Sequence, residues 1–319
     1  MRKRVAVIGA GVSGLTCAVL FAERGFQTVI FAEETGTETT SAAAGAIWFP
    51  YDAGPADAVI AWSLLTFDRL RELADDPGSG VVMSELRCCA RAGELPVPEW
   101  ADSLGVRRLE TGELLDAFTS GFALSVPLIE TTKYLSYLAT RFAKDGGSIV
   151  TGVHFENLDF APRAELKSGV DLVINCAGIG AQTLVPDCDL EPHRGQVVIM
   201  PKIELGYALV CDDPPLMYVL PHPESCVLGG TNTVSADRAP SAIETATIVE
   251  ECARVLNTTW PNATGERVGL RPFRRSGVRL ELDPSRTNAP VIHNYGHGGS
   301  GFTLSWGCAE SVLALAGPA

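Results

Sequence analysis

The chain has 319 residues, of which 46% are hydrophobic and 20% charged, which is typical of a globular protein with one large domain or two medium ones. Its net charge of −13 argues against nucleic acid or an anionic membrane as the main partner, because both need a basic face. A local basic pocket for a small molecule remains compatible with this charge.

The nine cysteines indicate a reducing environment. None belongs to a CxxC pair, which argues against a zinc site, and we expect no bound metal. Most lie in apolar stretches, as buried thiols do; Cys211 stays open as a disulfide partner.

The N-terminus lacks a cleavage site, no apolar run approaches the length of a membrane span, and the C-terminus has no targeting tripeptide. We therefore expect a cytoplasmic protein with no membrane partner.

The first fifty residues predict a βαβ unit. A β-branched stretch at 4–8 leads into the sequence GAGVSG, helical spacing follows over 13–24 until Gly25, and a second apolar stretch spans 28–32. Residues 34–46 are expected to form a loop with a short helix.

The rest of the chain mixes helical and strand-like segments. In order, the patterns predict a helix at 55–74, a strand at 81–91, a helix at 131–144, strands at 148–151 and 171–175, short antiparallel strands over 195–230, a helix at 241–256, a strand at 289–294 and a helix at 302–315.

These elements predict an α/β fold with two domains. A Rossmann-type nucleotide-binding domain of discontinuous segments would comprise 1–50, 130–190 and 285–319. An antiparallel-sheet α+β substrate domain would comprise 51–129 and 191–284.

The glycine-rich turn predicts a dinucleotide site. Gly9, Gly11 and Gly14 form GxGxxG between a strand and a helix, which allows a tight turn, close approach of a pyrophosphate and close helix packing. Glu33 follows the second strand, where a carboxylate can accept hydrogen bonds from ribose hydroxyls. The alternative is a tight turn without a ligand, and the motif alone does not separate NAD from FAD.

Three further segments carry a resemblance to a known family. They are TTSAAAGAIW at 39–48, INCAG at 174–178, and HNYGHGGSGFT at 293–303 followed by WG at 306–307. Together they resemble the D-amino-acid oxidases, and the resemblance covers nearly the whole chain, with RGQ at 194–196 and GGT at 229–231 as further landmarks. It implies FAD as the cofactor, with the C-terminal glycine turn and helix N-terminus lying against the flavin. The residues it places at FAD are Gly9, Gly11, Val12, Ser13, Gly14, Glu33, Glu34, Thr39, Thr40, Ser41, Ala44, Gly45, Ala46, Ile47, Val153, Cys176, Ala177, Gly178, Arg271, Gly296, Gly298, Gly299, Ser300, Gly301, Phe302 and Thr303.

The same resemblance implies a substrate site. Arg271, in GLRPFRR, matches the arginine that binds the substrate carboxylate, for which a guanidinium fork is well suited. Tyr218 matches a tyrosine that also meets the carboxylate, and Gly299 a glycine whose carbonyl accepts a hydrogen bond from the substrate amine. The alternatives are that Arg271 is a structural ion-pair partner and that Tyr218 is a core residue of a strand.

The implied reaction is oxidative deamination of a small D-amino acid, with chirality supplied only by the family. Hydride passes from the α-carbon to FAD and electrons pass to oxygen, giving a 2-oxo acid, ammonia and hydrogen peroxide. Four alternatives stay open: a D-aspartate oxidase, a glycine oxidase, a flavin-dependent amino-acid dehydrogenase, and a non-catalytic dinucleotide-binding sensor. Assembly as a homodimer also stays open.

Two departures from the family bear on specificity. The stretch between Cys211 and Tyr218 is short, so we expect at most a small lid over the site. Asn232 stands where D-aspartate oxidases carry an arginine, and residues 212–217 read DDPPLM, with two acids and no base. Since burying a second carboxylate without a partner is costly, we expect neutral D-amino acids to be preferred over acidic ones unless Arg87, Arg274 or Arg275 reaches the pocket; Leu216 and Met217 would suit an apolar side chain.

Overall fold

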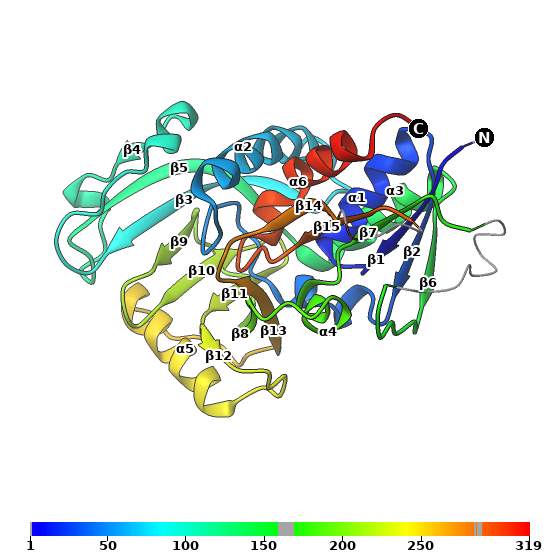
Figure 1. Cartoon of the computed structure of the whole chain (residues 1–319). Helices are drawn as coiled ribbons and strands as arrows, with labels where there is room; N and C mark the ends of the chain where they lie inside the picture. Colours follow the sequence, from blue (N-terminus) through cyan, green and yellow to red (C-terminus); the bar gives the residue numbers. More distant parts are fainter. Residues whose placement is uncertain (1, 159–168, 284, 286–288) are drawn as a thin grey trace.

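The strands form two sheets that lie next to each other. The structure is a computed structural model that describes residues 2–158, 169–283, 285 and 289–319. Figure 1 shows one sheet with its helices on the side of the two chain termini and the other sheet extending away from them. The first sheet has six strands and the second has nine.

The six-stranded sheet is the predicted Rossmann-type sheet. β1 pairs in parallel with β2 and β7, β2 with β6, and β7 with β15, whereas β14 is antiparallel to β15. The central strands are buried almost along their whole length, as expected where helices and loops cover both faces. The order is β14 (Arg279–Asp283), β15 (Val291–Tyr295), β7 (Leu172–Asn175), β1 (Arg4–Ile8), β2 (Gln27–Ala32) and β6 (Ser148–Thr151).

Helices cover this sheet. α1 (Val12–Glu23) packs against α3 (Thr131–Lys144) and α6 (Gly301–Ala316), and α2 (Ala56–Leu73) packs against α6 on its other side. Ten of the twelve residues of α1 are buried because neighbouring elements surround it. The N-terminus of α1 is thereby fixed directly after β1.

The nine-stranded sheet is mixed. Its pairs are antiparallel except for β3 with β9, and α5 packs against β8, β10 and β11. The path is β12-β8-β11-β10-β9-β3-β5-β4, with β13 also on β8. The bounds are β3 (Val81–Ala90), β4 (Arg107–Arg108), β5 (Ser120–Ile129), β8 (Leu190–Pro201), β9 (Tyr207–Cys211), β10 (Met217–Pro221), β11 (Ser225–Gly229), β12 (Thr233–Val234), β13 (Gly265–Arg274) and α5 (Ala242–Leu256).

Short helical turns complete the fold. They are η1 (Gly36–Glu38), η2 (Thr40–Ala43), η3 (Glu99–Leu104), η4 (Thr111–Glu113), η6 (Gly178–Gly180) and α4 (Ala181–Leu184). One hydrophobic core runs between the two sheets, since Val5, Leu86 and Leu220 belong to the same buried cluster.

The predicted α/β fold class is confirmed, but five strands were not predicted: β5, β13 and β14, and the two-residue strands β4 and β12. β5 and β13 were not predicted, because Pro127 and Pro272 and the arginines of β13 obscure their alternation. The predicted boundaries also place residues 279–283 in the substrate domain, whereas β14 pairs with β15 in the six-stranded sheet. The division into two domains otherwise stays a prediction.

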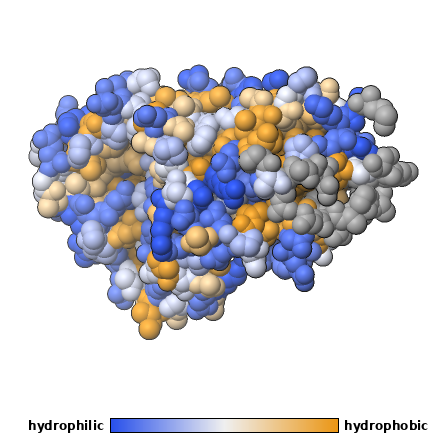
Figure 2. Space-filling model, in the orientation of Figure 1, coloured by the Kyte–Doolittle hydropathy of each residue, from blue (hydrophilic) through white to orange (hydrophobic). Residues whose placement is uncertain are grey.

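The surface and the cysteines agree with a folded globular chain. Polar residues cover most of the face seen in Figure 2, with smaller apolar patches between them. All nine cysteines are free and only Cys188 is exposed, so the disulfide left open for Cys211 does not form. Among the helices formed by the described residues, none has both the length and the apolar character that a membrane crossing requires.

Candidate active site

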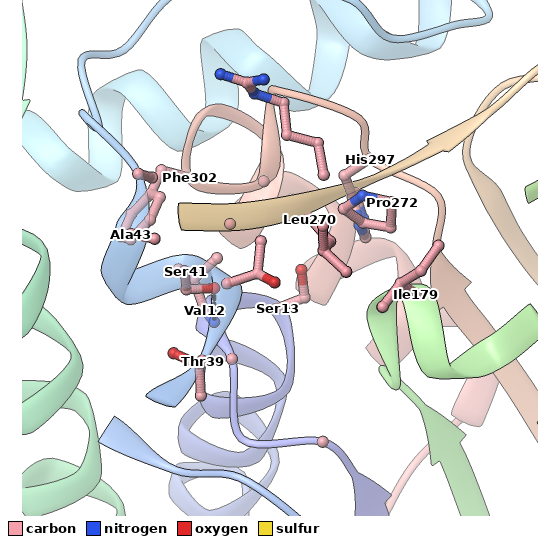
Figure 3. A pocket seen from close by; sticks show the side chains of 18 of the residues that line it. Val12, Ser13, Thr39, Ser41, Ala43, Ile179, Leu270, Pro272, His297 and Phe302 are labelled. Atoms are coloured by element: carbon pink, nitrogen blue, oxygen red, sulfur yellow. Dashed lines mark hydrogen bonds between the residues drawn. The ribbon is translucent and has the colours of Figure 1, made fainter. Parts of the chain in front are cut away.

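A cavity of about 620 Å³ lies at the carboxyl edge of the parallel strands. Gly9, Glu33 and Cys176 follow β1, β2 and β7 directly and all line it, which is where open α/β sheets bind ligands. Figure 3 shows side chains from α1, the 39–43 segment, η6, β13 and the start of α6 around the same space. The cavity therefore joins the two sheets.

The glycine turn has the geometry of a phosphate site. A Cβ atom at Gly9, whose φ is +103°, would lie 2.4 Å from the carbonyl oxygen of Cys176, and one at Gly14 would lie 2.0 Å from that of Gly9. The turn thus requires glycine at both positions. Gly11 caps α1 without a side-chain hydrogen bond, and no acidic residue lies in the first turn. The positive end of the helix dipole lies at the cavity, and no carboxylate in the first turn of the helix neutralises it.

Two acidic residues follow the carboxyl end of β2. Glu33 and Glu34 both line the cavity. Glu33 Oε2 lies 3.0 Å from His154 Nδ1, and the pKa of His154 is raised because the Glu33 carboxylate stabilises its protonated form. Glu34 accepts a hydrogen bond of 2.5 Å from Arg238, which lies in the loop between β12 and α5. His154 and Arg238 were not predicted, since neither lies in a motif.

The loop after β2 contacts the helix N-terminus. Ser41 Oγ, in η2, accepts a 3.0 Å hydrogen bond from the amide of Val12. Further along, a Cβ atom at Gly45 would lie 2.7 Å from the side chain of Leu220 and 3.1 Å from the ring of Tyr218. This loop therefore spans the cavity from the glycine turn to the nine-stranded sheet.

The C-terminal glycine turn is held against the segment at 49–51. Thr303 Oγ1 accepts from the amide of Phe49 and donates to its carbonyl, at 3.2 and 3.0 Å. Ser300 Oγ makes the same pair of contacts with the backbone of Tyr51. Gly299 lies between Tyr51 and Arg271, since a Cβ atom there would come within 2.8 Å of the tyrosine ring.

Arg271 supplies a cation that the fold leaves without a carboxylate partner. It lines the cavity, and among the described residues none forms an ion pair with it. Its Nη1 donates one hydrogen bond of 2.9 Å to the carbonyl of Thr231. Gly195 makes room for the guanidinium, because a Cβ atom there would lie 2.4 Å from Nη1. The alternative of a structural ion pair is therefore wrong.

Tyr218 also lines the cavity, packed beside that arginine. Its ring lies over Gly229 and Gly230, where added Cβ atoms would come within 1.9 and 2.8 Å of ring atoms. This contact explains the GGT landmark. Burial raises the pKa of Tyr218, and the nearby Arg271 opposes that effect, so the hydroxyl stays protonated near neutral pH.

Tyr51 and Asp212 are two further cavity residues that were not predicted as site residues. Tyr51 lines the cavity, and its hydroxyl lies 3.4 Å from Asn232 Nδ2. Burial raises the pKa of Tyr51, with the charges of Asp212 and Asp52 adding to it. Asp212 also lines the cavity. Tyr51 directly follows the matched loop, and that proximity was the available signal.

The three arginines that could have supplied a second cation to the pocket pair with carboxylates of the protein. Arg87 pairs with Glu85 at 2.7 Å, Arg274 with Asp187 at 2.9 Å, and Arg275 with Glu191. None of these arginines lines the cavity. Met217 does not reach it either, since it is fully buried in the core behind β10, whereas Leu216 does.

The structure brings most of the predicted cofactor residues together around the cavity, with three exceptions. Gly14, Gly296 and Ser300 do not line it. Gly14 packs on the glycine turn, Gly296 lies against the side chain of Arg274 at a φ of +85°, and Ser300 holds Tyr51. These three residues pack against neighbouring segments of the chain.

The residues present fit a flavin dinucleotide. The turn at Gly9 admits only glycine, the N-terminus of α1 would hold the pyrophosphate, and Glu33 would meet a ribose. The cavity continues past the loop at 39–47 to Tyr218 and Arg271, which leaves room for a ring system and a substrate. Among the residues described, no group of three or more His, Cys, Asp or Glu side chains is arranged to hold a metal ion.

Comparisons with known proteins agree with this geometry. A family model described as "FAD dependent oxidoreductase" matches residues 4–315. A D-amino-acid oxidase of Rubrobacter xylanophilus is 38% identical over 99% of this chain and 96% of its own length, and one of Streptomyces coelicolor is 36% identical over 98% and 96%. The crystal structure of a glycine oxidase from Geobacillus kaustophilus superposes with a TM-score of 0.78 at 20% identity, covering 98% of this chain and 94% of that one.

Proposed function

The chain belongs to the DAO family of FAD-dependent oxidoreductases, and on that premise we propose that it is a D-amino-acid oxidase for neutral substrates. FAD and a D-amino acid would share the cavity, and oxygen would take the electrons. The products would be a 2-oxo acid, ammonia and hydrogen peroxide.

One observation carries the proposal: Arg271 lines the cavity beside Tyr218 and Gly299, and none of the carboxylates that the structure describes forms an ion pair with it. Leaving a cation uncompensated costs free energy that a structural arginine would recover through an ion pair. A substrate carboxylate supplies the missing partner. A dinucleotide-binding sensor has no use for this arrangement, which disfavours the non-catalytic alternative.

The protein's part in the reaction is binding and orientation. When bound, FAD supplies the acceptor for the hydride of the α-carbon. Arg271 and the Tyr218 hydroxyl hold the α-carboxylate, and the Gly299 carbonyl accepts a hydrogen bond from the α-amine. Orientation of this kind contributes up to ~7–11 kcal/mol to lowering a barrier.

No side chain is required as a general base. The protonated Tyr218 donates to the carboxylate, and its raised pKa keeps it a donor throughout the neutral range. The segment between Cys211 and Tyr218 is too short for a long lid, so the product would leave without the opening of one.

Neutral side chains suit the described pocket better than acidic ones. Asn232 offers no charge, and Arg87, Arg274 and Arg275 each face a carboxylate of the protein. A second carboxylate on the substrate would lie near Asp212 without a cation.

Steady-state peroxide production tests the proposal. The FAD-loaded protein is assayed with D-alanine, D-valine, D-methionine, D-aspartate and D-glutamate, with L-alanine as the control. We expect the highest kcat/KM with a neutral D-amino acid and no turnover of L-alanine. Highest activity with D-aspartate or D-glutamate would contradict the assignment, and so would peroxide formed equally from both alanine enantiomers.

A further inference from the structure

Asp212 occupies the cavity face of the hairpin formed by β9 and β10. The strand register pairs Cys211 with Met217 and Val210 with Tyr218. Continued by one residue, it sets Asp212 opposite Leu216. Because side chains alternate along a strand, Val210, Asp212, Leu216 and Tyr218 share one face, and all four line the cavity.

The opposite face of the hairpin is core. Cys211 and Met217 are buried together in the cluster under α5. The register of β9 with β10 therefore fixes the face on which the Asp212 side chain lies. To turn this side chain away from the cavity, the strand pairing would have to shift by one residue, which would expose Met217.

Asp212 has no partner of its own among the residues that the structure describes: no ion pair or hydrogen bond reaches its carboxylate. Its neighbour Asp213 accepts a 2.7 Å hydrogen bond from the amide of Arg91. The Arg91 side chain is committed to Glu251 at 2.8 Å and to the carbonyl of Pro215 at 2.9 Å. The arginine that contacts Asp213 is thus committed to partners other than Asp212.

The surroundings of Asp212 favour a cation. Asp212 is exposed to solvent although it lines the cavity, and its pKa is raised, first because the surrounding protein partly desolvates the carboxylate and second because Asp213 adds negative charge. Arg271 is not among the charges that act on it, whereas Tyr51 feels both Asp212 and Arg271. Tyr51, Asp212 and Arg271 all line the same cavity, and both charges act on the Tyr51 hydroxyl.

The two charges match the ends of one kind of substrate. Asp212 lies two residues along β9 from Val210, which is opposite Tyr218, so it is roughly 7 Å from the Tyr218 position along the strand direction. A substrate with its α-carboxylate at Arg271 and Tyr218 would extend a long side chain past Leu216 toward that carboxylate.

We infer that Asp212 is a specificity-determining residue that extends the substrate range to D-amino acids with a cationic side chain, D-lysine and D-arginine, and repels those with an anionic one. The inference rests on the proposed function, because it takes Arg271 as the site of the α-carboxylate. An apolar stem would pack on Leu216 and Val210 while its charged tip reaches Asp212.

The test is the ratio of kcat/KM for D-lysine to that for D-norleucine, which has the same carbon chain without the charge. Asp212→Asn should lower this ratio about tenfold or more, because a charge-assisted hydrogen bond is lost. Asp213→Asn is the matched control: it removes the same charge one residue away, outside the cavity, and should leave the ratio unchanged. Asp212→Lys should lower the ratio further and raise kcat/KM for D-glutamate relative to D-glutamine.

Three outcomes would overturn the inference. If neither kcat/KM changes in Asp212→Asn, the carboxylate does not meet the side chain. An equal fall for both substrates shows that Asp212 acts on the α-amine, which all substrates share. If Asp212→Lys oxidises D-norleucine and keeps the wild-type ratio of kcat/KM for D-lysine to that for D-norleucine, the side chain at 212 likewise does not meet the substrate side chain. If the wild-type protein with FAD bound oxidises no D-amino acid, the proposed function fails and the inference with it.

Discussion

Replacing Arg271 with alanine removes the cation that we place at the substrate carboxylate. The side chain donates a hydrogen bond to the Thr231 carbonyl, interacts with the Tyr218 hydroxyl, and has no ion pair among the described residues. Its loss should therefore cost the fold little. The lost contact with a carboxylate is worth about 1.5–3 kcal/mol, which corresponds to a fall in kcat/KM of roughly 10- to 150-fold, and more in an enclosed site.

The assay is kcat/KM on D-alanine together with the FAD content of the purified variant. Arg271→Lys should recover part of the loss, because it keeps the charge without the guanidinium fork. Arg275→Ala is the matched control, since Arg275 is exposed and paired with Glu191 outside the cavity, and it should retain near wild-type kcat/KM. Near-normal turnover by Arg271→Ala with full FAD content would refute the reasoning and show that another group holds the carboxylate.

Three further predictions follow from single contacts. Gly9→Ala should lose FAD and lower Tm, because φ is +103° and the new Cβ would lie 2.4 Å from the carbonyl oxygen of Cys176; normal flavin content would contradict this. Gly229→Ala should raise KM for D-alanine by displacing the Tyr218 ring, whose Cζ lies 1.9 Å from the added atom, while flavin content persists; an unchanged KM would count against the role of Tyr218. Burial lowers the pKa of His222, His293 and His297 to about 4, so the unfolded chain binds their protons first and stability should fall as pH drops from about 6.5 toward 4, by up to ~1.4 kcal/mol per pH unit for each histidine; urea unfolding of the FAD-free protein that is no less stable at pH 5 than at pH 7 would contradict this.

Local sequence signals predicted the parts of the molecule that depend on local backbone geometry. The glycine turn, the acid after β2 and most helix bounds depend on residues close in the chain, so GxGxxG and Glu33 could be interpreted without the fold. The C-terminal glycine turn was recognised as a unit, but a motif does not say which of its residues face the ligand. Gly296 and Ser300 turned out to support neighbouring segments.

Long-range pairing accounts for what the sequence interpretation missed. Arg238 reaches Glu34 across 204 positions of the chain, and β14 returns to the six-stranded sheet after a long excursion. The direction of Asp212 follows only from the register of β9 with β10. Whether Arg87, Arg274 and Arg275 reach the pocket was likewise undetermined until their partners were placed.

Anaerobic reduction of the bound flavin by a D-amino acid tests the central claim most directly. The purified protein should be yellow, and its visible absorbance should bleach on anaerobic addition of D-alanine and return when oxygen is admitted, with peroxide formed in the same amount. L-alanine should leave the spectrum unchanged. A flavin that stays oxidised in the presence of D-alanine and the other neutral D-amino acids, or that bleaches equally with L-alanine, would contradict the account.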